Sequence, residues 1–171
     1  MKRLTSAIAL IAAMVGVVFP ALAQAAPGDL DPTFSSDGKQ TTDFGGNELA
    51  TAMALQGDGK IVVVGYTGGA DSDFALARFS PNGKLDTSFS GDGKQVTDLG
   101  GTADRAQGVA LQGNGKIVVV GFAGTQSPGG DDFGDLAVAR YNANGSLDTS
   151  FSGDGKQTTD FGGQASEATG N

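Results

Sequence analysis

A tandem repeat restricts the fold of this chain more than any other feature of its sequence. The phrase LDTSFSGDGKQ occurs at residues 85–95 and again at 147–157, and LDPTFSSDGKQ at 30–40 is a close relative. These phrases begin 55 and 62 residues apart, and most of the excess lies in the segment TQSPGGDD, so the underlying period is about 55. A self-similar period of this length is typical of proteins in which one supersecondary unit is repeated.

Each unit predicts four short antiparallel strands. Residues 50–56 alternate small and larger side chains, which predicts a strand with one closely approached face. After a Gln-Gly-Asp-Gly turn, residues 60–65 are apolar and β-branched on both faces, which predicts a strand covered on both sides. The third strand is expected at residues 74–79 and the fourth from Lys84 into LDTSF. The second unit repeats the pattern, with its third strand at 136–141 and its fourth from Ser146.

Four such strands in succession predict one blade of a β-propeller. A β-sandwich would also give short strands and turns, but the long repeat favours the propeller. We therefore expect an all-β fold of antiparallel four-stranded blades, with two complete blades and partial ones. The expected divisions are a signal peptide at 1–25 and a repeat region at 26–171 that comprises the closing strand of a preceding blade (28–46), blade one (47–99), blade two (100–163) and the truncated start of a further blade (164–171).

Three phrases carry a resemblance to a known family. LDTSFSGDGKQTTDFGG, ALQGDGKIVVVG and DFALARFSPNGKLD resemble the delta-60 repeat, a β-propeller-type repeat of exported bacterial proteins. The resemblance covers essentially all of residues 28–168 and departs from the family at Gly57 and Gly113, where that repeat often has proline. It implies a propeller fold and an exported protein, and it implies no defined activity.

The first residues have the pattern of a secretory signal peptide. Lys2 and Arg3 precede an apolar stretch at 7–19, and a run of small residues then allows cleavage before Gln24 or before Ala26. The apolar stretch is too short to cross a bilayer as a helix, and the absence of cysteine excludes a lipid anchor at the cleavage site. We expect a secreted or periplasmic protein without a membrane span.

The chain is strongly acidic. Its formal net charge is −8, and removal of Lys2 and Arg3 with the signal peptide would make it −10. Such a charge repels nucleic acid and anionic membrane surfaces, so neither is expected as a partner. The 17 Asp against only two Glu, together with 29 Gly, predict many turns and little helix.

Two complete blades are too few to close a ring, because propellers have about four to eight. We expect the chain to be either a fragment of a longer gene product or a protomer that completes a ring with other copies. In both cases the terminal blade faces would be apolar and open, which predicts self-association.

The residue types argue against catalysis. The chain has no His and no Cys, which excludes Ser-His-Asp and Cys-His nucleophilic sites and the usual zinc ligand sets. We therefore expect a non-enzymatic binding or scaffold role. A fragment of a secreted carbohydrate-active hydrolase remains an alternative, because glycosidases need only two carboxyl groups. Nearly every Asp lies beside Gly, Ser or Asn in a predicted turn, however, which favours a structural role.

Acidic residues gather in the loop before the third strand of each unit, where they suggest calcium. The candidate ligands are Asp71 and Asp73 in the first unit and Asp131, Asp132 and Asp135 in the second. Neither group has the spacing of an EF-hand. A calcium-stabilised surface adhesion repeat is thus a further alternative, and no other cofactor is expected.

Two arginines recur at one place in both units. Arg78 and Arg140 lie inside an otherwise apolar strand, where a catalytic or anion-binding role is conceivable. Because the same residue recurs in each unit, we expect each to pair instead with a turn carboxylate, Asp86 or Asp148.

Function is expected where the units differ. The second unit has a six-residue insertion that includes Thr125, Gln126, Ser127 and Pro128, and insertions in repeat proteins often form binding loops. Arg105, Asp104 and Glu48 lie in the connections that lead into a blade. In a four-stranded blade these two kinds of connection emerge on one side, provided that LDTSF and KQTTD do not form separate strands. We expect that side to recognise a protein or a polysaccharide.

Overall fold

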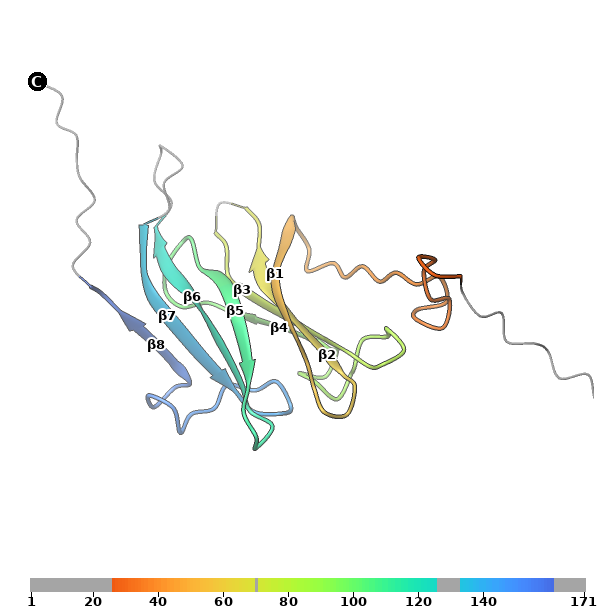
Figure 1. Ribbon diagram of the computed structural model, residues 1–171. Helices are drawn as coiled ribbons and strands as arrows, with labels where there is room; N and C mark the ends of the chain where they lie inside the picture. Colours follow the sequence, from red (N-terminus) through yellow and green to blue (C-terminus); the bar gives the residue numbers. More distant parts are fainter. Residues whose placement is uncertain (1–25, 70, 126–132, 162–171) are drawn as a thin grey trace, which may run out of the picture.

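The computed structural model describes residues 26–69, 71–125 and 133–161, so the predicted signal peptide and residues 164–171 lie outside it. The described residues form two four-stranded antiparallel sheets, and each sheet follows the order of the chain (Figure 1). The first contains β1 (Glu48–Leu55), β2 (Ile61–Thr67), β3 (Phe74–Phe79) and β4 (Lys94–Thr97). The second contains β5 (Arg105–Leu111), β6 (Ile117–Thr125), β7 (Phe133–Tyr141) and β8 (Lys156–Thr159).

This arrangement confirms the prediction of an all-β protein built from four-stranded blades. We refer to β1–β4 as blade one and to β5–β8 as blade two. The two sheets do not close into a ring. In the ranges that the structure covers, no helix is long and apolar enough to traverse a bilayer.

The predicted start of the fourth strand at Lys84 is wrong, because β4 begins ten residues later at Lys94. LDTSF contributes only one bridge, between Phe79 and Leu85, and then folds into a turn. The N–H group of Phe89 donates to the Asp86 carbonyl at 2.9 Å. Positive φ angles follow, including 51° at Ser90, and they end any extended path. The second unit behaves alike: its expected start at Ser146 is wrong, and β8 begins at Lys156.

The core lies between the two sheets. Val62 and Val64 on β2 are fully buried, and their partners across the sheet, Arg78 and Leu76, share the same face. That face belongs to one cluster with apolar residues of the facing sheet: Ala106, Ile117, Val119, Ala137, Ala139 and Tyr141. Burial of apolar surface against blade two therefore stabilises blade one.

The first strands of the two blades lie side by side, as Figure 1 shows for β1 and β5. The Thr51 hydroxyl donates to the Ala106 carbonyl across this contact at 2.8 Å. Each strand has a bulge after its first alanine, Ala50 in β1 and Ala106 in β5. The bulge brings the backbone so close to Gly65 that an added Cβ would lie 1.8 Å from the Leu49 carbonyl oxygen. Only glycine fits there.

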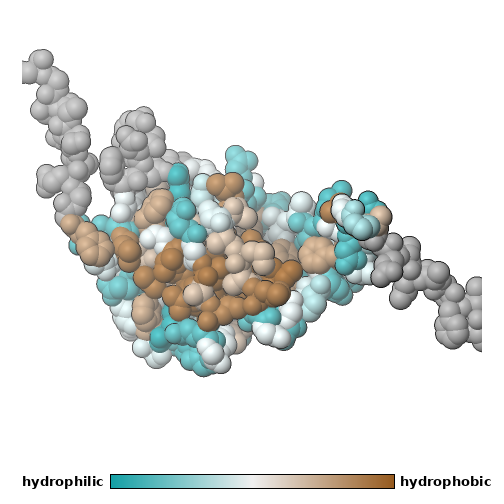
Figure 2. All heavy atoms as spheres, viewed as in Figure 1, coloured by the Kyte–Doolittle hydropathy of each residue, from teal (hydrophilic) through white to brown (hydrophobic). Residues whose placement is uncertain are grey.

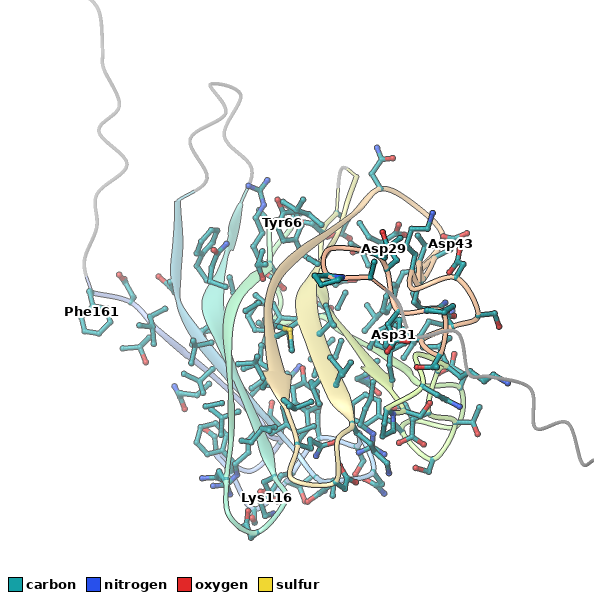
Figure 3. All side chains as sticks on the ribbon, turned by 45° about the vertical axis from the view of Figure 1, so that its right-hand side comes forward. Asp29, Asp31, Asp43, Tyr66, Lys116 and Phe161 are labelled. Carbon is teal, nitrogen blue, oxygen red and sulfur yellow. The ribbon has the colours of Figure 1, made fainter. Side chains whose placement is uncertain are left out.

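The segment at residues 28–46 lies against blade one (Figure 3, where Asp29, Asp31 and Asp43 mark it). It was predicted as a closing strand, but it pairs with no strand of the described chain and forms none itself. Its contacts nevertheless match those between the blades. Lys94 Nζ donates to the Asp43 carbonyl at 3.1 Å, and Lys156 Nζ donates to the Asp98 carbonyl at 3.0 Å.

A second pair of contacts repeats the match. The N–H group of Ser35 donates to the Asn82 carbonyl at 2.8 Å, and that of Ser90 donates to the Asn144 carbonyl at 2.7 Å. The segment at residues 28–46 therefore docks on blade one as the corresponding part of blade one docks on blade two.

The junction between the segment at residues 28–46 and blade one lacks one hydrogen bond that the junction between the blades has. The buried Tyr141 hydroxyl donates to Thr97 Oγ1 at 2.9 Å between the blades. At the equivalent positions, Thr42 and Phe79 line one groove, and Phe79 has no hydroxyl. The buried Thr42 Oγ1 has no hydrogen-bond partner among the described residues. A buried polar atom without a partner is destabilising.

Phe79→Tyr should therefore stabilise the protein by about 1 kcal/mol, because the new hydroxyl would bond to Thr42 as Tyr141 bonds to Thr97. Urea unfolding followed by circular dichroism measures the change. The same substitution in a Thr42→Val background should give no gain. Equal gains in both backgrounds would show that the hydrogen bond is not the cause.

Candidate cation site at the junction of the blades

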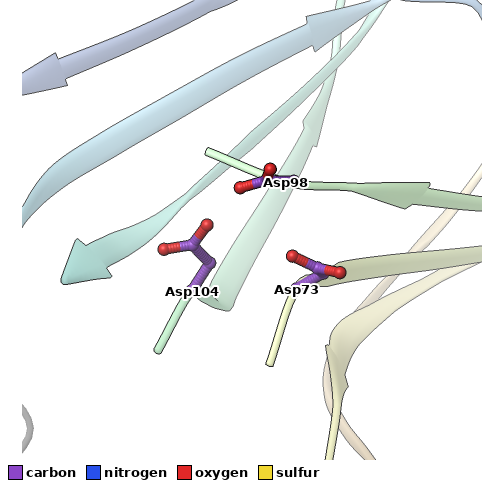
Figure 4. Close-up of side chains that lie close together, drawn as sticks. All are labelled: Asp73, Asp98 and Asp104. Atoms are coloured by element: carbon purple, nitrogen blue, oxygen red, sulfur yellow. The ribbon is translucent and has the colours of Figure 1, made fainter. Parts of the chain in front are cut away.

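Three carboxylates meet where blade one passes into blade two. Asp73 directly precedes β3, Asp98 directly follows β4, and Asp104 directly precedes β5. Each offers one oxygen, and these three oxygens lie within 4.8 Å of one another. Figure 4 shows the carboxylate groups arranged around one shared space. We call these residues the junction cluster.

Backbone pairing brings the two loops of the junction cluster together. Ser72 and Ala103 form a parallel bridge. The N–H group of Ser72 donates to the Thr102 carbonyl at 3.2 Å, and that of Asp104 donates to the Ser72 carbonyl at 2.7 Å. The loop before β3 is thus fixed to the connection that enters β5, independently of any side chain.

The Asp104 carboxylate also closes the turn between the blades. Its Oδ2 accepts a hydrogen bond from the Leu99 N–H group at 2.7 Å. The turn before β1 is closed in the same way by Glu48, whose Oε1 accepts from the N–H groups of Phe44 at 3.0 Å and Gly46 at 2.8 Å. Asp98 Oδ1 also accepts within this turn, from the Gly100 N–H group at 2.5 Å, as Asp43 Oδ1 accepts from the Gly45 N–H group at 2.6 Å before β1. Closing the turn therefore uses two carboxylates, and it leaves Asp73 unexplained.

The second oxygen of Asp104, Oδ1, makes no hydrogen bond of good geometry within the described ranges, although the N–H groups of Gly101 and Gly124 act on the carboxylate. Asp104 is fully buried. No Lys or Arg of those ranges forms an ion pair with the junction cluster. Lys156 reaches it only through the backbone carbonyl of Asp98. Uncompensated negative charge in a buried place is costly, which favours binding of a proton or a cation.

The pKa values of the cluster shift in the direction that this crowding predicts. Burial raises the pKa of Asp73, and the negative charges of Asp98, Asp71 and Asp104 raise it further. Burial also raises the pKa of Asp104, against the backbone N–H groups around it, which lower it. Both groups therefore bind a proton more readily than a carboxyl group in water does when no cation is bound.

Of the five predicted calcium ligands, the structure places Asp73 in a cluster. Asp71 lies outside it, although its charge contributes to the raised pKa of Asp73. Asp135 lies on β7 opposite Ala123, at the position of blade two that corresponds to Asp73. Asp131 and Asp132 lie outside the described residues.

Asp98 and Asp104 were not predicted as ligands. The signal that could have found them is the connection TDLGGTAD, which places one Asp at the end of blade one and another at the start of blade two. Both ends of this connection lie on the same side as the loop before β3, because the strands alternate in direction.

The residues of the predicted recognition surface lie at one end of the sheets. Glu48 and Arg105 begin β1 and β5, and Thr125 ends β6 at the same end (Figure 1). LDTSF adds no strand, so each blade has four strands. The connection between the second and third strands and the connection into the next blade therefore emerge on one side, as expected. Glu48 closes its turn, and the Arg105 guanidinium lies 5.0 Å from the centre of the Tyr66 ring. Gln126, Ser127 and Pro128 lie outside the described residues.

The recurrent arginines form the expected ion pairs. Arg78 Nε lies 2.8 Å from Asp86 Oδ2, and Arg140 Nε lies 2.6 Å from Asp148 Oδ2. A lysine joins each pair through the same oxygen, and the hydrogen bond from Lys116 contributes most to the lowered pKa of Asp148. Burial acts to raise the pKa of Asp86, but hydrogen bonds and the neighbouring cations lower it overall. Asp86 and Asp148 thus form ion pairs with residues of their own blades.

Comparison with known proteins supports the architecture. The family model described as a domain of unknown function (DUF5122) beta-propeller matches residues 56–89 and 112–151, which are corresponding parts of the two blades. No curated protein and no solved structure matches the chain. The chain is therefore similar to a β-propeller-type repeat family for which no molecular activity is known.

The two ion pairs should differ in their contribution to stability. The Arg78 side chain is 4% exposed and that of Arg140 is 22% exposed, so only Arg140 can regain water easily when its partner is neutralised. We expect Asp86→Asn to lower the free energy of unfolding by about 3 kcal/mol and Asp148→Asn to lower it by less. Urea unfolding of both variants compares them directly. A larger loss in Asp148→Asn would contradict this explanation.

The junction cluster should make the protein more stable in mild acid when a chelator is present. Because the folded pKa values of Asp73 and Asp104 are raised, their contribution to stability falls as pH rises above about 4 and returns as pH is lowered. The lowered pKa values of Asp86 and Asp148 act oppositely, and their contribution is lost below about pH 4.

We therefore expect the melting temperature in EDTA to rise as the pH is lowered from 7 toward about 4 and to fall in stronger acid. Asp104→Asn should flatten the first of these changes, and Glu48→Gln should leave it unaltered. If both variants keep the full rise, relief of net negative charge and not the cluster would be its cause.

Proposed function

We propose that this chain is an exported, non-enzymatic repeat module of the delta-60 type, whose blades dock on further blades to form a scaffold. The observation that carries the proposal is the uncovered apolar face of blade two. Loops at one end of the sheets, including the starts of β1 and β5, would then present a binding surface for a protein or a polysaccharide. The signal-peptide pattern at residues 1–25 supports export.

Equivalent positions in the two blades differ sharply in exposure. Val64 is 1% exposed, whereas Val120 at the same place in blade two is 42% exposed. Phe74 is buried completely, whereas its counterpart Leu136 is 48% exposed. Blade two covers the first of each pair, and no described residue covers the second. The outer face of blade two is therefore apolar at the positions that blade two buries in blade one, as expected of a face on which a further blade could pack.

The face of blade one that points away from blade two corresponds to the face with which blade two packs on blade one. Ala75, Ala77 and Phe79 correspond to Ala137, Ala139 and Tyr141, which are the residues that blade two buries against blade one. A groove of about 190 Å³ remains between this face and the segment at residues 40–44. Apolar side chains also gather in a band across the face that Figure 2 displays, and exposed apolar residues of β1 include Leu49, Met53 and Leu55. Such contiguous apolar surface is typical of interaction sites.

The geometry of the carboxylates supports a non-enzymatic role. A glycosidase needs two carboxyl groups that a sugar can reach. In the described part of the chain, three carboxylates meet in the junction cluster, where Asp104 is fully buried and cannot contact a sugar. Asp86 and Asp148 are engaged by arginine and lysine. No observation favours the hydrolase alternative.

Self-association of the mature chain tests the docking role. We expect size-exclusion chromatography with light scattering to show masses above that of the monomer, increasing with protein concentration. Val120→Lys should shift the distribution toward the monomer, because a charge on the outer face of blade two cannot be buried cheaply. Asn114→Lys adds the same charge in an exposed turn of the same blade and serves as the control.

A mature chain that stays monomeric at every concentration would contradict the docking role. Equal association of Val120→Lys and the wild type would place the contact on another surface.

A further inference from the structure

We propose that the junction cluster binds a calcium ion that ties blade one to blade two. The ligands assigned to the ion are the carboxylates of Asp73, Asp98 and Asp104. This site lies at the same end of the sheets as the predicted recognition surface, beside Arg105, and away from the docking faces. It would regulate the stability of the junction that those functions require.

The spacing of the oxygens suits calcium. Calcium binds oxygen ligands at about 2.3–2.6 Å, so two ligands on opposite sides of one ion lie about 5 Å apart at most. The three oxygens of the cluster lie within 4.8 Å of one another, which is inside this limit. One calcium ion could therefore be bound by all three carboxylates.

The unsatisfied oxygen points to a missing partner. Asp104 is fully buried, and its Oδ2 already accepts from Leu99. Its Oδ1 makes no hydrogen bond of good geometry in the described part of the chain, although the N–H groups of Gly101 and Gly124 act on the carboxylate, which faces the other two (Figure 4). A cation bound to Oδ1 would satisfy this atom and leave the turn intact. Ser72, next to Asp73, also has a buried hydroxyl without a hydrogen-bond partner in the described ranges. Neutral hydroxyl and carbonyl oxygens commonly complete a calcium shell.

Charge and access favour the same ion. Three carboxylates contribute three negative charges to a small volume, and no described Lys or Arg forms an ion pair with them. Asp98 is exposed and Asp73 is half-buried, so the ion could enter from solvent and keep water molecules in its remaining positions. Burial of Asp104 on the other side fixes one ligand firmly.

The turn before β1 provides an internal comparison. Glu48 closes that turn as Asp104 closes the turn between the blades, and Asp43 takes the place of Asp98. No described residue takes the place of Asp73 there, and no cluster of three carboxylates forms in that part of the described chain. Turn closure therefore accounts for Asp98 and Asp104, as it does for Asp43 and Glu48, and not for the approach of Asp73 as a third carboxylate.

The consequence is a link between elements that do not pair within one sheet. Asp73 belongs to the loop between β2 and β3 of blade one, and Asp104 belongs to the entrance of blade two. An ion shared by both would oppose separation of the blades. It would stabilise the folded chain by binding the folded state and not the unfolded one.

Calcium titration of the full mature chain after removal of metals with EDTA tests the proposal. Isothermal titration calorimetry should show one site, and a concentration of ten times Kd should lower the unfolding equilibrium constant about elevenfold. Asp73→Asn is the main variant, because this residue is half-buried and its loss should leave the fold intact. It should weaken calcium binding at least tenfold. Asp104→Asn should abolish binding, with circular dichroism as the check that it folds.

Glu48→Gln is the matched control, since it alters the equivalent turn and not the cluster. It should bind calcium as the wild type does. The proposal is overturned if the wild type shows no binding in 10 mM calcium, if Asp73→Asn binds as tightly as the wild type, or if Glu48→Gln loses binding equally. Stabilisation by magnesium and not by calcium would overturn the assignment of the ion.

Discussion

The burial of one blade's apolar face by the next blade is the interaction on which this structure depends. A four-stranded sheet of this size has one face that must be covered, and Val62, Val64 and Leu76 are covered only because blade two lies against them. Hydrogen bonds fix the position of the two sheets: Thr51 bonds to the backbone of β5, and Tyr141 bonds to Thr97. Stability is therefore a property of the junction more than of either blade.

Recurrence separates structural residues from candidates for function. The arginine pairs, the lysine contacts to Asp43 and Asp98, and the turns of LDTSF appear in more than one unit and serve the blade or its junction. The close approach of an aromatic ring to a glycine also recurs, since Phe34 lies against Gly83 and Phe89 against Gly145. What differs is the turn that enters each blade, where Asp104 joins two further carboxylates and Glu48 does not.

The repeat and its alternating side chains were sufficient to predict the fold class and the first three strands of each blade. They failed for the fourth strand, because the apolar Leu85 and Phe89 suggest an extended path, whereas the positive φ angles at Ser90 and its neighbours turn the chain first. The ion pairs of Arg78 and Arg140 could be predicted because an arginine occupies the same position in both units. The junction cluster could not be predicted residue by residue, because Asp73 and Asp104 are brought together by a single parallel bridge that leaves no periodic pattern.

Amide hydrogen exchange at two serines tests most directly whether one set of contacts builds every junction. Ser35 and Ser90 donate equivalent hydrogen bonds, the first from the segment at residues 28–46 to blade one and the second from blade one to blade two. Both amides should be protected in the mature protein, with exchange rates well below those of an unfolded chain. Protection of Ser90 together with unprotected exchange at Ser35 would contradict it, because residues 28–46 would then not dock on blade one as the blades dock on each other.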